Sequence, residues 1–396
     1  MTKPLDGIKI IDFSRVLAAP LATQTLAELG ADVVKIERPH RGDETRSFEP
    51  RLPAGESAYF FAFNRGKRSI TLDLKTAEGA RIARELTRDA DVVVENFLPG
   101  VMDGMGLGYD SLRRVNPRLV YVATTGFGQT GPLRDEKGYD TIFQALSGIM
   151  SMTGEADGPP VKAGIPVSDM TSALWVAIAA LTGLVGRATT GHGCFVDVSM
   201  MDAQLALGAL AAARVFAYDE DPHRMGTEHP GRVPSAAFVC ADEEWIHVSA
   251  SDQHWEPLCK AVGLEDLIHD PRYADNSSRV QNRLELMPLL RRAIGAMPRD
   301  EAVGTLGAAG VPVGAVQTVR EALASEHAVA REMVQNFEHP TEGSFPGLRT
   351  PLAITGYDSP MVGTPPLLGA DTRRVLSERL RMSDGTITSL HDQGVI

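Results

Sequence analysis

The sequence contains little cysteine, and this limits the classes of protein to which it can belong. Its three cysteines, Cys194, Cys240 and Cys259, are odd in number and widely spaced. We therefore expect neither a disulfide framework nor a zinc site, and no bound metal.

The chain also lacks the segments that direct a protein to a membrane. Its start, MTKPLDGIKI, has neither the basic nor the apolar region of a signal peptide. The longest apolar run, residues 174–185, is too short to span a bilayer and is typical of a core helix. A cytoplasmic protein is expected.

Positive charge is in the minority, with 39 Lys and Arg against 51 Asp and Glu and a formal net charge of -12. This balance argues against nucleic acid or an anionic membrane as a partner. The hydrophobic fraction of 43% and charged fraction of 23% are those of an ordinary globular protein. A length of 396 residues favours two or three domains.

The first half of the chain alternates between strand-like and helix-like patterns. Helix-like stretches cover residues 21–29 and 77–87, and Gly30 closes the first of them. Alternation at this spacing predicts βαβ units and a mainly parallel sheet covered on both faces. The strand-like runs are residues 8–13, 32–37, 69–74, 91–95, 119–124 and 194–199.

The second half changes in character. After one long helix expected at 203–217, residues 219–234 are rich in charge, Gly and Pro and are predicted to be a linker. A smaller α+β region follows, and then a Pro- and Gly-rich tail that returns across a surface before a helix at 371–381. The smaller region is expected to hold two short strands in 236–250, amphipathic helices to about 309, a strand at 311–317 and a helix at 319–328.

Asp169 stands where a polar turn changes into an apolar helix. Ser168 is a good N-cap residue, so Asp169 is expected in the first turn of a buried helix. Unpaired N–H groups and the helix dipole would favour the ionised carboxylate there. Asp169 could thus be a nucleophile, or it could only cap its helix.

The segment from Gly126 to Gly131 fits the pattern GxGxxG after a predicted strand. Pro132 follows at once, so no helix N-terminus is available for a pyrophosphate. No acidic residue lies about twenty positions further on to bind a ribose. The glycines are better explained as a flexible loop beside a site, and an NAD-dependent oxidoreductase becomes a weak alternative.

Basic residues gather near the expected strand ends despite the acidic composition. In open α/β sheets ligands bind beyond the carboxyl ends of the strands, so this set could hold a nucleotide phosphate. Each residue could also be a solvated charge paired with a neighbour such as Glu37 or Asp73. The set comprises Arg38, residues 64–68, Lys75 and Lys137.

The order and spacing of several motifs carry a family resemblance over nearly the whole chain. They are GIKIIDFSRVLAAPLATQTLAELGADVVKIERP, NRGKRSITLDLK, ENFLPGVMDGMGLGYDSL, TGFGQTGP, GYDTIFQALSGIMSMTG, GIPVSDMTSAL, TGHGCFVDVSMMDAQL and PPLLGADTRRVL. The chain resembles the class III CoA transferases, the formyl-CoA and carnitine CoA transferase (CaiB/BaiF) family.

The resemblance implies an acyl-CoA:carboxylate CoA-transferase in which Asp169 is the nucleophile. It would form an aspartyl-acyl anhydride and then an aspartyl-CoA thioester. The site should exclude bulk water and offer N–H donors, for which amides near Ala18 and in the glycine loop are candidates. No cofactor is implied beyond the CoA thioester substrate.

The resemblance also implies the residues that surround the substrates. Val16 and Ala18 would line the path of the pantetheine arm, and Leu17, Tyr139 and Asp140 would border the acid. Arg38, Lys75 and Lys137 would face the nucleotide phosphates, with Leu72, Asn96 and Phe97 around the adenosine. The stretch from Ser249 through Ser251 to Gln253 would contact the acyl group or cover Asp169.

The sequence departs from the family pattern at three places. Gly104 stands where some relatives carry a basic residue, which puts one phosphate contact in doubt. Leu17 replaces the Gln of formyl-CoA transferases, which argues against formate and oxalate as the natural pair. Residues 249–253 stand where a glycine-rich loop is expected. A dicarboxylic donor such as succinyl-CoA is the working hypothesis, beside carnitine-like, aromatic or branched acids.

Two alternatives remain open. Alpha-methylacyl-CoA racemases share most motifs but use a His–Asp pair, and Tyr139 stands at the His position; its usual pKa makes it a poor base. A non-catalytic acyl-CoA-binding relative would not need Asp169.

The resemblance finally implies an architecture of two interlocked subunits. The Rossmann-like large domain would be built from both ends of the chain, with the small α+β domain inserted between them. The expected boundaries are 1–218 for the first part of the large domain, 219–234 for the linker, 235–330 for the small domain and 331–396 for the return segment.

Overall fold

The computed structural model describes residues 2–396, which form two compact units. Unit 1 comprises the chain up to Ile149, Lys162–Ala217 and His327–Ile396, and unit 2 comprises Met150–Val161 and Tyr218–Glu326. The stretch 219–234, expected as a linker, belongs to unit 2, because its backbone pairs with unit 2 residues: His229 N–H bonds the Ser235 carbonyl, and Gly226 N–H bonds that of Gly154. Residues 150–161, expected in the large domain, join the same unit.

Unit 1 is built on a six-stranded sheet with the order β3-β2-β1-β4-β5-β6. All of its pairings are parallel, as the alternating pattern predicts. The strand order reverses between β1 and β4, so the loops that follow these two strands flank a topological switch point. The strands are β1 (Lys9–Asp12), β2 (Asp32–Glu37), β3 (Arg68–Thr71), β4 (Val92–Glu95), β5 (Val120–Thr125) and β6 (Phe195–Ser199).

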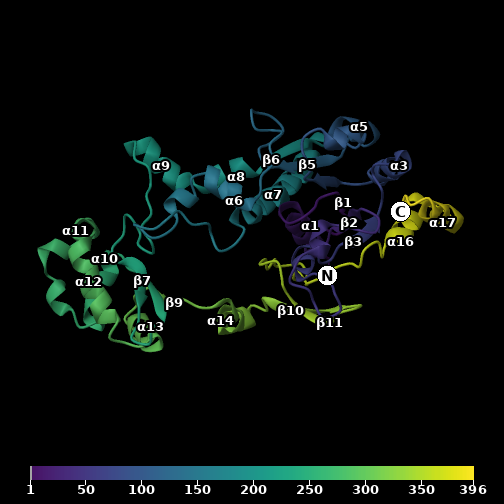
Figure 1. Ribbon diagram of the computed structural model, residues 1–396. Coiled ribbons are helices and arrows are strands. Elements are labelled where there is room, and N and C mark those ends of the chain that lie inside the picture. Colours follow the sequence, from purple (N-terminus) through teal and green to yellow (C-terminus); the bar gives the residue numbers. More distant parts are fainter. Residues whose placement is uncertain (1) are drawn as a thin grey trace. The chain divides into compact units, whose positions relative to one another are not determined.

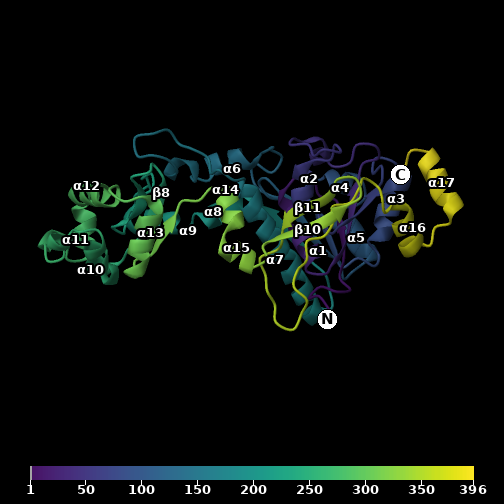
Figure 2. The ribbon, with the colours of Figure 1, turned by 90° about the horizontal axis from the view of Figure 1, so that it is seen from below.

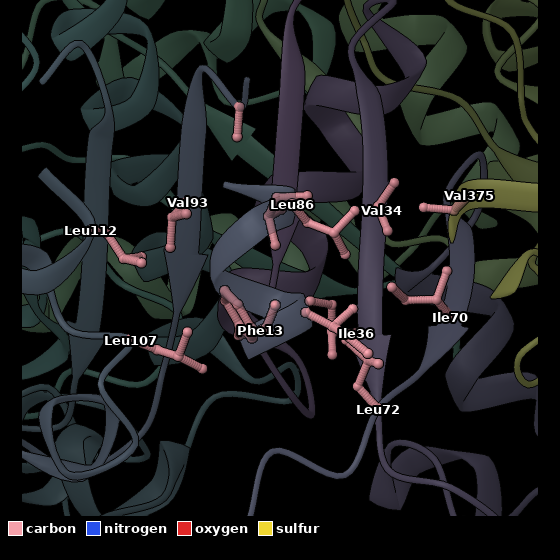
Figure 3. Close-up of a cluster of buried hydrophobic side chains, with 14 of the residues drawn as sticks. Phe13, Val34, Ile36, Ile70, Leu72, Leu86, Val93, Leu107, Leu112 and Val375 are labelled. Atoms are coloured by element: carbon pink, nitrogen blue, oxygen red, sulfur yellow. The ribbon is translucent and has the colours of Figure 1, made fainter. Parts of the chain in front are cut away.

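Helices cover both faces of this sheet (Figure 1). On one face, α1 (Ala18–Glu28) and α7 (Val167–Thr190) bury Ala and Val side chains against β1, β4 and β5. On the other face, Ile and Leu side chains of α3 (Ala77–Leu86), α5 (Tyr109–Val115), α16 (Thr372–Leu380) and α17 (Asp384–Asp392) form a second core with the strands. Figure 3 shows this core, in which Val375 joins Val34 and Ile70 although it follows them by more than 300 residues in the sequence.

Helix α7 differs from the buried helix expected from its sequence. Only one side packs against the sheet and α1, while Leu174, Trp175 and Val185 are exposed, Val185 by 71%. Within residues 2–396, α7 is long and apolar enough to cross a bilayer, as is the bent pair α8 (Met200–Leu207) and α9 (Ala209–Tyr218), by length and composition only. This pair was expected as one helix, but the chain turns by 64° at Gly208.

The Pro- and Gly-rich tail, in which no strand was expected, contains a β-hairpin. Strands β10 (Val334–His339) and β11 (Gly343–Leu348) pair antiparallel. Phe337 and Phe345 pack against Phe61 of α2 (Ala58–Phe63), and Figure 2 shows the hairpin beside α2. Gly343, Pro346 and Gly347 hide the strand pattern in the sequence, since neither residue type favours strands.

Three short elements of unit 1 follow strands β2, β4 and β5 in the chain, on the carboxyl side of the sheet. They are the 3-10 turn η1 (Glu44–Ser47), α4 (Val101–Gly104) and α6 (Asp140–Leu146). Helix α15 (Glu326–Ala330) lies at the border of the two units in the sequence.

Unit 2 is a small α+β assembly, as expected. Strands β7 (Ser235–Val239), β8 (Trp245–Ser249) and β9 (Val313–Ala315) form an antiparallel sheet. Four helices pack on this sheet, three of them through buried Leu, Ile and Trp side chains and α11 through Val280. They are α10 (Asp252–Ala261), α11 (Asn276–Gln281), α12 (Arg283–Ile294) and α13 (Arg299–Ala308). Helix α14 (Val319–Ala324) and three 3-10 turns, η2 (Met150–Met152), η3 (Glu265–Leu267) and η4 (Pro271–Tyr273), complete the elements.

Candidate active site

Asp169 lies in the first turn of α7, but its helix is not capped as the sequence suggests. The helix begins at Val167, and the cap is Asp140 of α6, whose carboxylate oxygen Oδ1 accepts from the N–H groups of Ser168 at 2.7 Å and Asp169 at 3.3 Å. Gln144 holds the other oxygen of Asp140 at 2.6 Å. Ser168 is fully buried, and its hydroxyl donates to the Asp140 carbonyl at 3.1 Å. The expected N-cap role of Ser168 is therefore wrong.

The capping carboxylate changes the electrostatics of Asp169. The N–H groups that were expected to stabilise the Asp169 carboxylate are hydrogen-bonded to Asp140, which adds a like charge instead. Burial, followed by the charge of Asp140, raises the pKa of Asp169 to about 7. The expectation that the helix terminus keeps this carboxylate charged at neutral pH is not met in full, because the helix N–H groups bind Asp140 and burial raises the pKa of Asp169.

A tyrosine that the sequence did not single out lies in the same neighbourhood. Burial and the charges of Asp169, Asp43 and Asp140 raise the pKa of Tyr59 in α2 to about 12. Its ring packs edge-on against Phe48 and Phe63, with centroids 5.4 and 5.2 Å apart. The phenol therefore stays protonated at neutral pH and can donate a hydrogen bond. Nothing in the run Ser57–Phe63 marks Tyr59 as functional, since only the tertiary fold brings it near the two aspartates.

The residues predicted to bind CoA all lie on loops or helix starts at one edge of the sheet. Because the strands are parallel, the segments that follow β1 to β5 leave from the same edge. In chain order these segments carry Val16 and Ala18, then Arg38, then Leu72 and Lys75, then Asn96 and Phe97, and finally Lys137. Leu72 is only 1% exposed and packs in the core, so its side chain is not available at the surface in this structure.

Three of the basic residues expected near the strand ends are free to bind an anion, whereas Arg65, Lys67 and Arg68 form ion pairs with Glu28, Asp12 and Asp32. Arg38, Lys75 and Lys137 are exposed, and within residues 2–396 their side chains have no hydrogen bond or ion pair. Of the acidic neighbours, Glu37 binds Arg46 at 2.7 Å, and Asp73 accepts from the Lys75 backbone at 3.0 Å without an ion pair to its side chain within residues 2–396. Three unpaired cations at a sheet edge suit the phosphates of a nucleotide.

The loops after β1 and β4 are joined to each other across the switch point. The Asn96 side chain accepts from Arg15 N–H at 2.9 Å and donates to the Arg15 carbonyl at 2.7 Å. The Arg15 guanidinium lies 4.7 Å from the centre of the Phe97 ring and forms an ion pair with Glu44 at 3.0 Å. Asn96 thus fixes the backbone beside Val16, a role that its sequence position did not suggest.

The predicted acid-binding residues fall into two groups. Leu17 is buried at the start of α1, while Tyr139 is 79% exposed immediately before α6. Ser249 and Ser251 belong to unit 2, where Ser251 caps α10 through a reciprocal contact with His254.

The glycine loop between β5 and α6 has a packing function. No helix begins until Asp140, as Pro132 suggested. A side chain at Gly138 would come within 2.3 Å of the Phe143 ring, and one at Gly126 within 2.8 Å. Gly128 and Gly131 adopt positive φ. The glycines therefore fit the close approach of this loop to α6 and do not form a dinucleotide cradle.

Comparison with known proteins identifies relatives along the full chain. Residues 5–372 match CoA-transferase family III. The chain is 37% identical to a succinyl-CoA:glutarate CoA-transferase of Mus musculus, covering 100% of this chain and 90% of that protein. It is also 37% identical to a succinate–glutarate CoA-transferase of Agrobacterium fabrum (95% of each) and to a formyl-CoA:oxalate CoA-transferase of Streptomyces avermitilis (100% of each).

Solved structures with the same fold include a CaiB/BaiF family protein from Brucella suis. It has a TM-score of 0.86 and 38% identity, over 96% of this chain and 100% of that one. A protein from Mycobacterium tuberculosis has a TM-score of 0.84 and 32% identity, over 94% and 99%.

Proposed function

Because this chain belongs to CoA-transferase family III, and is thus a CoA-transferase, we propose that it moves CoA between an acyl-CoA and a free carboxylic acid through covalent intermediates on Asp169. The observation that carries the proposal is the state of the Asp169 carboxylate. Within residues 2–396 its oxygens have no cation and no hydrogen bond, and its pKa is raised to about 7. A more basic, unpaired carboxylate is a better nucleophile once it is ionised.

The first half of the reaction transfers CoA to the enzyme. A carboxylate oxygen of Asp169 attacks the thioester carbonyl, the C–S bond breaks, and CoA leaves as thiolate with an aspartyl-acyl anhydride behind it. The thiolate then attacks the aspartyl carbonyl of that anhydride. The donor acid departs as carboxylate, and an aspartyl-CoA thioester remains.

The second half repeats these steps in reverse with the acceptor. The acceptor carboxylate attacks the aspartyl-CoA carbonyl and displaces thiolate, which gives a new anhydride. The thiolate attacks the acceptor's carbonyl, so the new acyl-CoA leaves and the Asp169 carboxylate is regenerated. No net proton is taken up, and no resident cofactor is needed.

The surroundings of Asp169 suit this chemistry. Tyr59 offers a neutral O–H donor for a substrate carboxylate, and Tyr139 offers a second, exposed one. Near the start of α1, the N–H groups of Leu17, Ala18 and Ala19 are buried and have no hydrogen-bond acceptor within residues 2–396. Donors of this kind would stabilise the oxyanion that develops at each carbonyl. Ser249 and Ser251 of unit 2 are proposed to border the acid.

We assign the phosphates and adenosine of CoA to the carboxyl edge of the sheet. Arg38, Lys75 and Lys137 would bind the phosphates, and Asn96 and Phe97 would border the adenosine, with Leu72 contributing through its backbone. Val16 and Ala18 would line the pantetheine path. Gly104 supplies no side chain, so these three cations carry the phosphate recognition.

For the acid we propose a dicarboxylate such as succinate or glutarate. Two observations support this proposal. The mouse and Agrobacterium relatives are named for succinate and glutarate, and Leu17 stands where formyl-CoA transferases have Gln. A second carboxylate needs a defined polar partner, since an apolar pocket alone distinguishes similar acids poorly.

We further propose that the chain works as an interlocked homodimer in the cytoplasm. A groove of about 670 Å³ lies between α7, β6 and α8, and the exposed side chains of Trp175 and Ile178 line it. Phe216 and Leu210 are more than four-fifths exposed, at 87% and 81%. Such a surface favours burial by a second copy. The three free cysteines fit a reducing compartment.

The test combines transfer with isotope labelling. The protein is incubated with a panel of acyl-CoAs and free acids, one of them labelled with ¹⁸O in its carboxylate, and exchange is followed by mass spectrometry. The mechanism requires one ¹⁸O to pass from the acceptor into the Asp169 side chain, which is read in the proteolytic peptide. Asp169→Ala should abolish transfer, whereas the control Glu78→Ala, on the exposed surface of α3, should retain it.

Two outcomes would reject the proposal. Transfer that persists in Asp169→Ala would exclude the covalent route. Exchange of the α-proton of a branched acyl-CoA with solvent, without transfer to any acid, would instead indicate racemase-type chemistry.

A further inference from the structure

Val16 has a backbone conformation that its side chain disfavours. It lies between β1 and α1 with φ of 69°, and it is the one β-branched residue among the non-glycine residues of positive φ in 2–396. A side chain branched at Cβ is strained in this region, so surrounding contacts must hold the conformation.

A buried ion pair makes these contacts. The N–H of Val16 lies 3.3 Å from each carboxylate oxygen of Asp43. Asp43 forms an ion pair with Lys35 at 2.9 Å, and neither side chain is more than 1% exposed. Lys35 also donates to the carbonyl of Ser14 at 2.7 Å, two residues before Val16. The pair therefore holds the β1–α1 loop both at the strained residue and just before it.

Asp43 is itself held by groups outside this loop. The N–H and hydroxyl of Thr45 donate to its carboxylate at 3.0 and 2.8 Å. Its own N–H donates to Glu37 at 2.9 Å, and Glu37 is fixed by Arg46. Burial alone would raise the pKa of Asp43, but Lys35 and the Thr45 bonds outweigh it and lower the pKa. An ionised, anchored acceptor is thus always present beneath Val16.

We propose that Asp43 and Lys35 are positioning residues for CoA transfer, which keep Val16 left-handed so that the β1–α1 loop is shaped to receive the pantetheine arm. This inference rests on the proposed function, in which Val16 and Ala18 line that path. It predicts that the pair acts on the binding of acyl-CoA much more than on the binding of the acceptor acid.

The alternative is a pair that only stabilises the fold. The two roles differ in their dependence on the side chain at position 16. Glycine adopts positive φ without the penalty of valine, so a loop with glycine at this position keeps its shape without a strong acceptor. If Asp43 acts by holding Val16, its removal must matter less once Val16 is replaced by glycine.

A double-mutant cycle of Asp43→Asn and Val16→Gly tests this dependence. With valine at 16, Asp43→Asn should raise the KM for acyl-CoA and the Kd of CoA by roughly 10-fold or more, because the neutral amide accepts more weakly from Val16 and no longer forms the ion pair with Lys35. The KM for the acceptor should change by less than about 3-fold, and in the Val16→Gly background the effect of Asp43→Asn on the KM for acyl-CoA should also fall below about 3-fold. Calorimetric titration with CoA gives the Kd independently of turnover.

The matched control is Asp91→Asn. Asp91 precedes β4 at the opposite edge of the same sheet and forms an ion pair with Arg187 at 2.8 Å. Its loss should lower the melting temperature while the KM for acyl-CoA stays the same. Should Asp43→Asn fail to fold, Thr45→Val removes one anchor of Asp43 and keeps its charge, and a selective rise in the KM for acyl-CoA is again expected.

Equal effects of Asp43→Asn in the two backgrounds, or equal rises in both KM values, would overturn the positioning role. Failure of the proposed function is seen separately, as absence of CoA transfer by the wild-type protein in the same assay.

Discussion

Two groups of charges in unit 1 differ in whether each carboxylate has a cation beside it. Beneath the β1–α1 loop, Lys67 binds Asp12 at 3.0 Å and Lys35 binds Asp43 at 2.9 Å, so each negative charge has a cation. Around Asp169, the carboxylates of Asp140 and Asp169 share one helix end with no lysine or arginine bound to either within residues 2–396.

The pKa values follow this difference. Burial would raise the pKa of Asp12, but Lys67 and Lys35 outweigh it and the pKa is lowered. Burial also raises the pKa of Asp169, and with only Asp140 nearby nothing opposes it. The carboxylates that are paired with lysine hold the backbone in place. Asp169, which has no cation beside it, keeps a more basic carboxylate that can act as a nucleophile. The same fold thus supplies a rigid support and a basic nucleophile.

We expect the largest effect on stability where a buried carboxylate loses the lysine that neutralises it. Lys67 donates to Asp12, the Pro20 carbonyl and Asn64, with all three distances between 2.9 and 3.0 Å. Burial lowers the pKa of Lys67 to about 8, so the ammonium still predominates at neutral pH. Lys67→Met removes the ion pair of buried Asp12 and leaves it only the charge of Lys35 nearby, so it should lower the free energy of unfolding by about 3–5 kcal/mol, as measured by urea denaturation at pH 7. The exposed pair Arg81–Glu78 is the control, since Arg81→Ala should cost less than about 0.5 kcal/mol.

Replacement of Asp169, which has no cation beside it, should have the opposite effect and stabilise the protein. Above pH 7, ionised Asp169 costs free energy in the folded state that it does not cost in the unfolded chain, because its pKa is raised from 3.8 to about 7. Asp169→Asn should therefore stabilise the protein by about 1–2 kcal/mol at pH 8. The gain should shrink through the window from pH 7 down to pH 4, where both states become protonated. A loss of stability at pH 8 would contradict this account of Asp169.

The smallest expected effect is a shift in the pH dependence of transfer. It separates the contribution of Asp140 to the raised pKa of Asp169 from the contribution of burial. Asparagine at 140 can still accept from Ser168 N–H but carries no charge, so Asp140→Asn should lower the pKa of Asp169. The rate of transfer, which needs ionised Asp169, should rise with pH through about 7 in the wild type. In Asp140→Asn this rise in rate should occur at a pH lower by roughly half a unit, since burial is the larger cause of the raised pKa of Asp169. If the rate rises at the same pH in the variant and the wild type, Asp140 only caps α7.

Elements whose pattern is local could be predicted from the amino-acid sequence alone. Strand β2 lies at residues 32–37 as predicted, and the alternation of strands and helices is enough to require the parallel sheet. It follows that residues after different strands leave from one edge, so Arg38 and Lys75 could be grouped from their positions alone, whereas Asn96 was added only by the family resemblance. The motifs also placed Asp169 in the first turn of its helix.

Features that depend on contacts between distant segments emerged only from the folded chain. Asp140, rather than Ser168, caps α7, and no local rule assigns a cap to a residue 28 positions away. Tyr59 joins the aspartates because α2 packs at the same edge, and Lys35 is one polar residue in an apolar strand until Asp43 is seen beside it. Periodicity reports which way a side chain points along its own element. The partner it meets there, and hence its charge state, is fixed only when the chain folds.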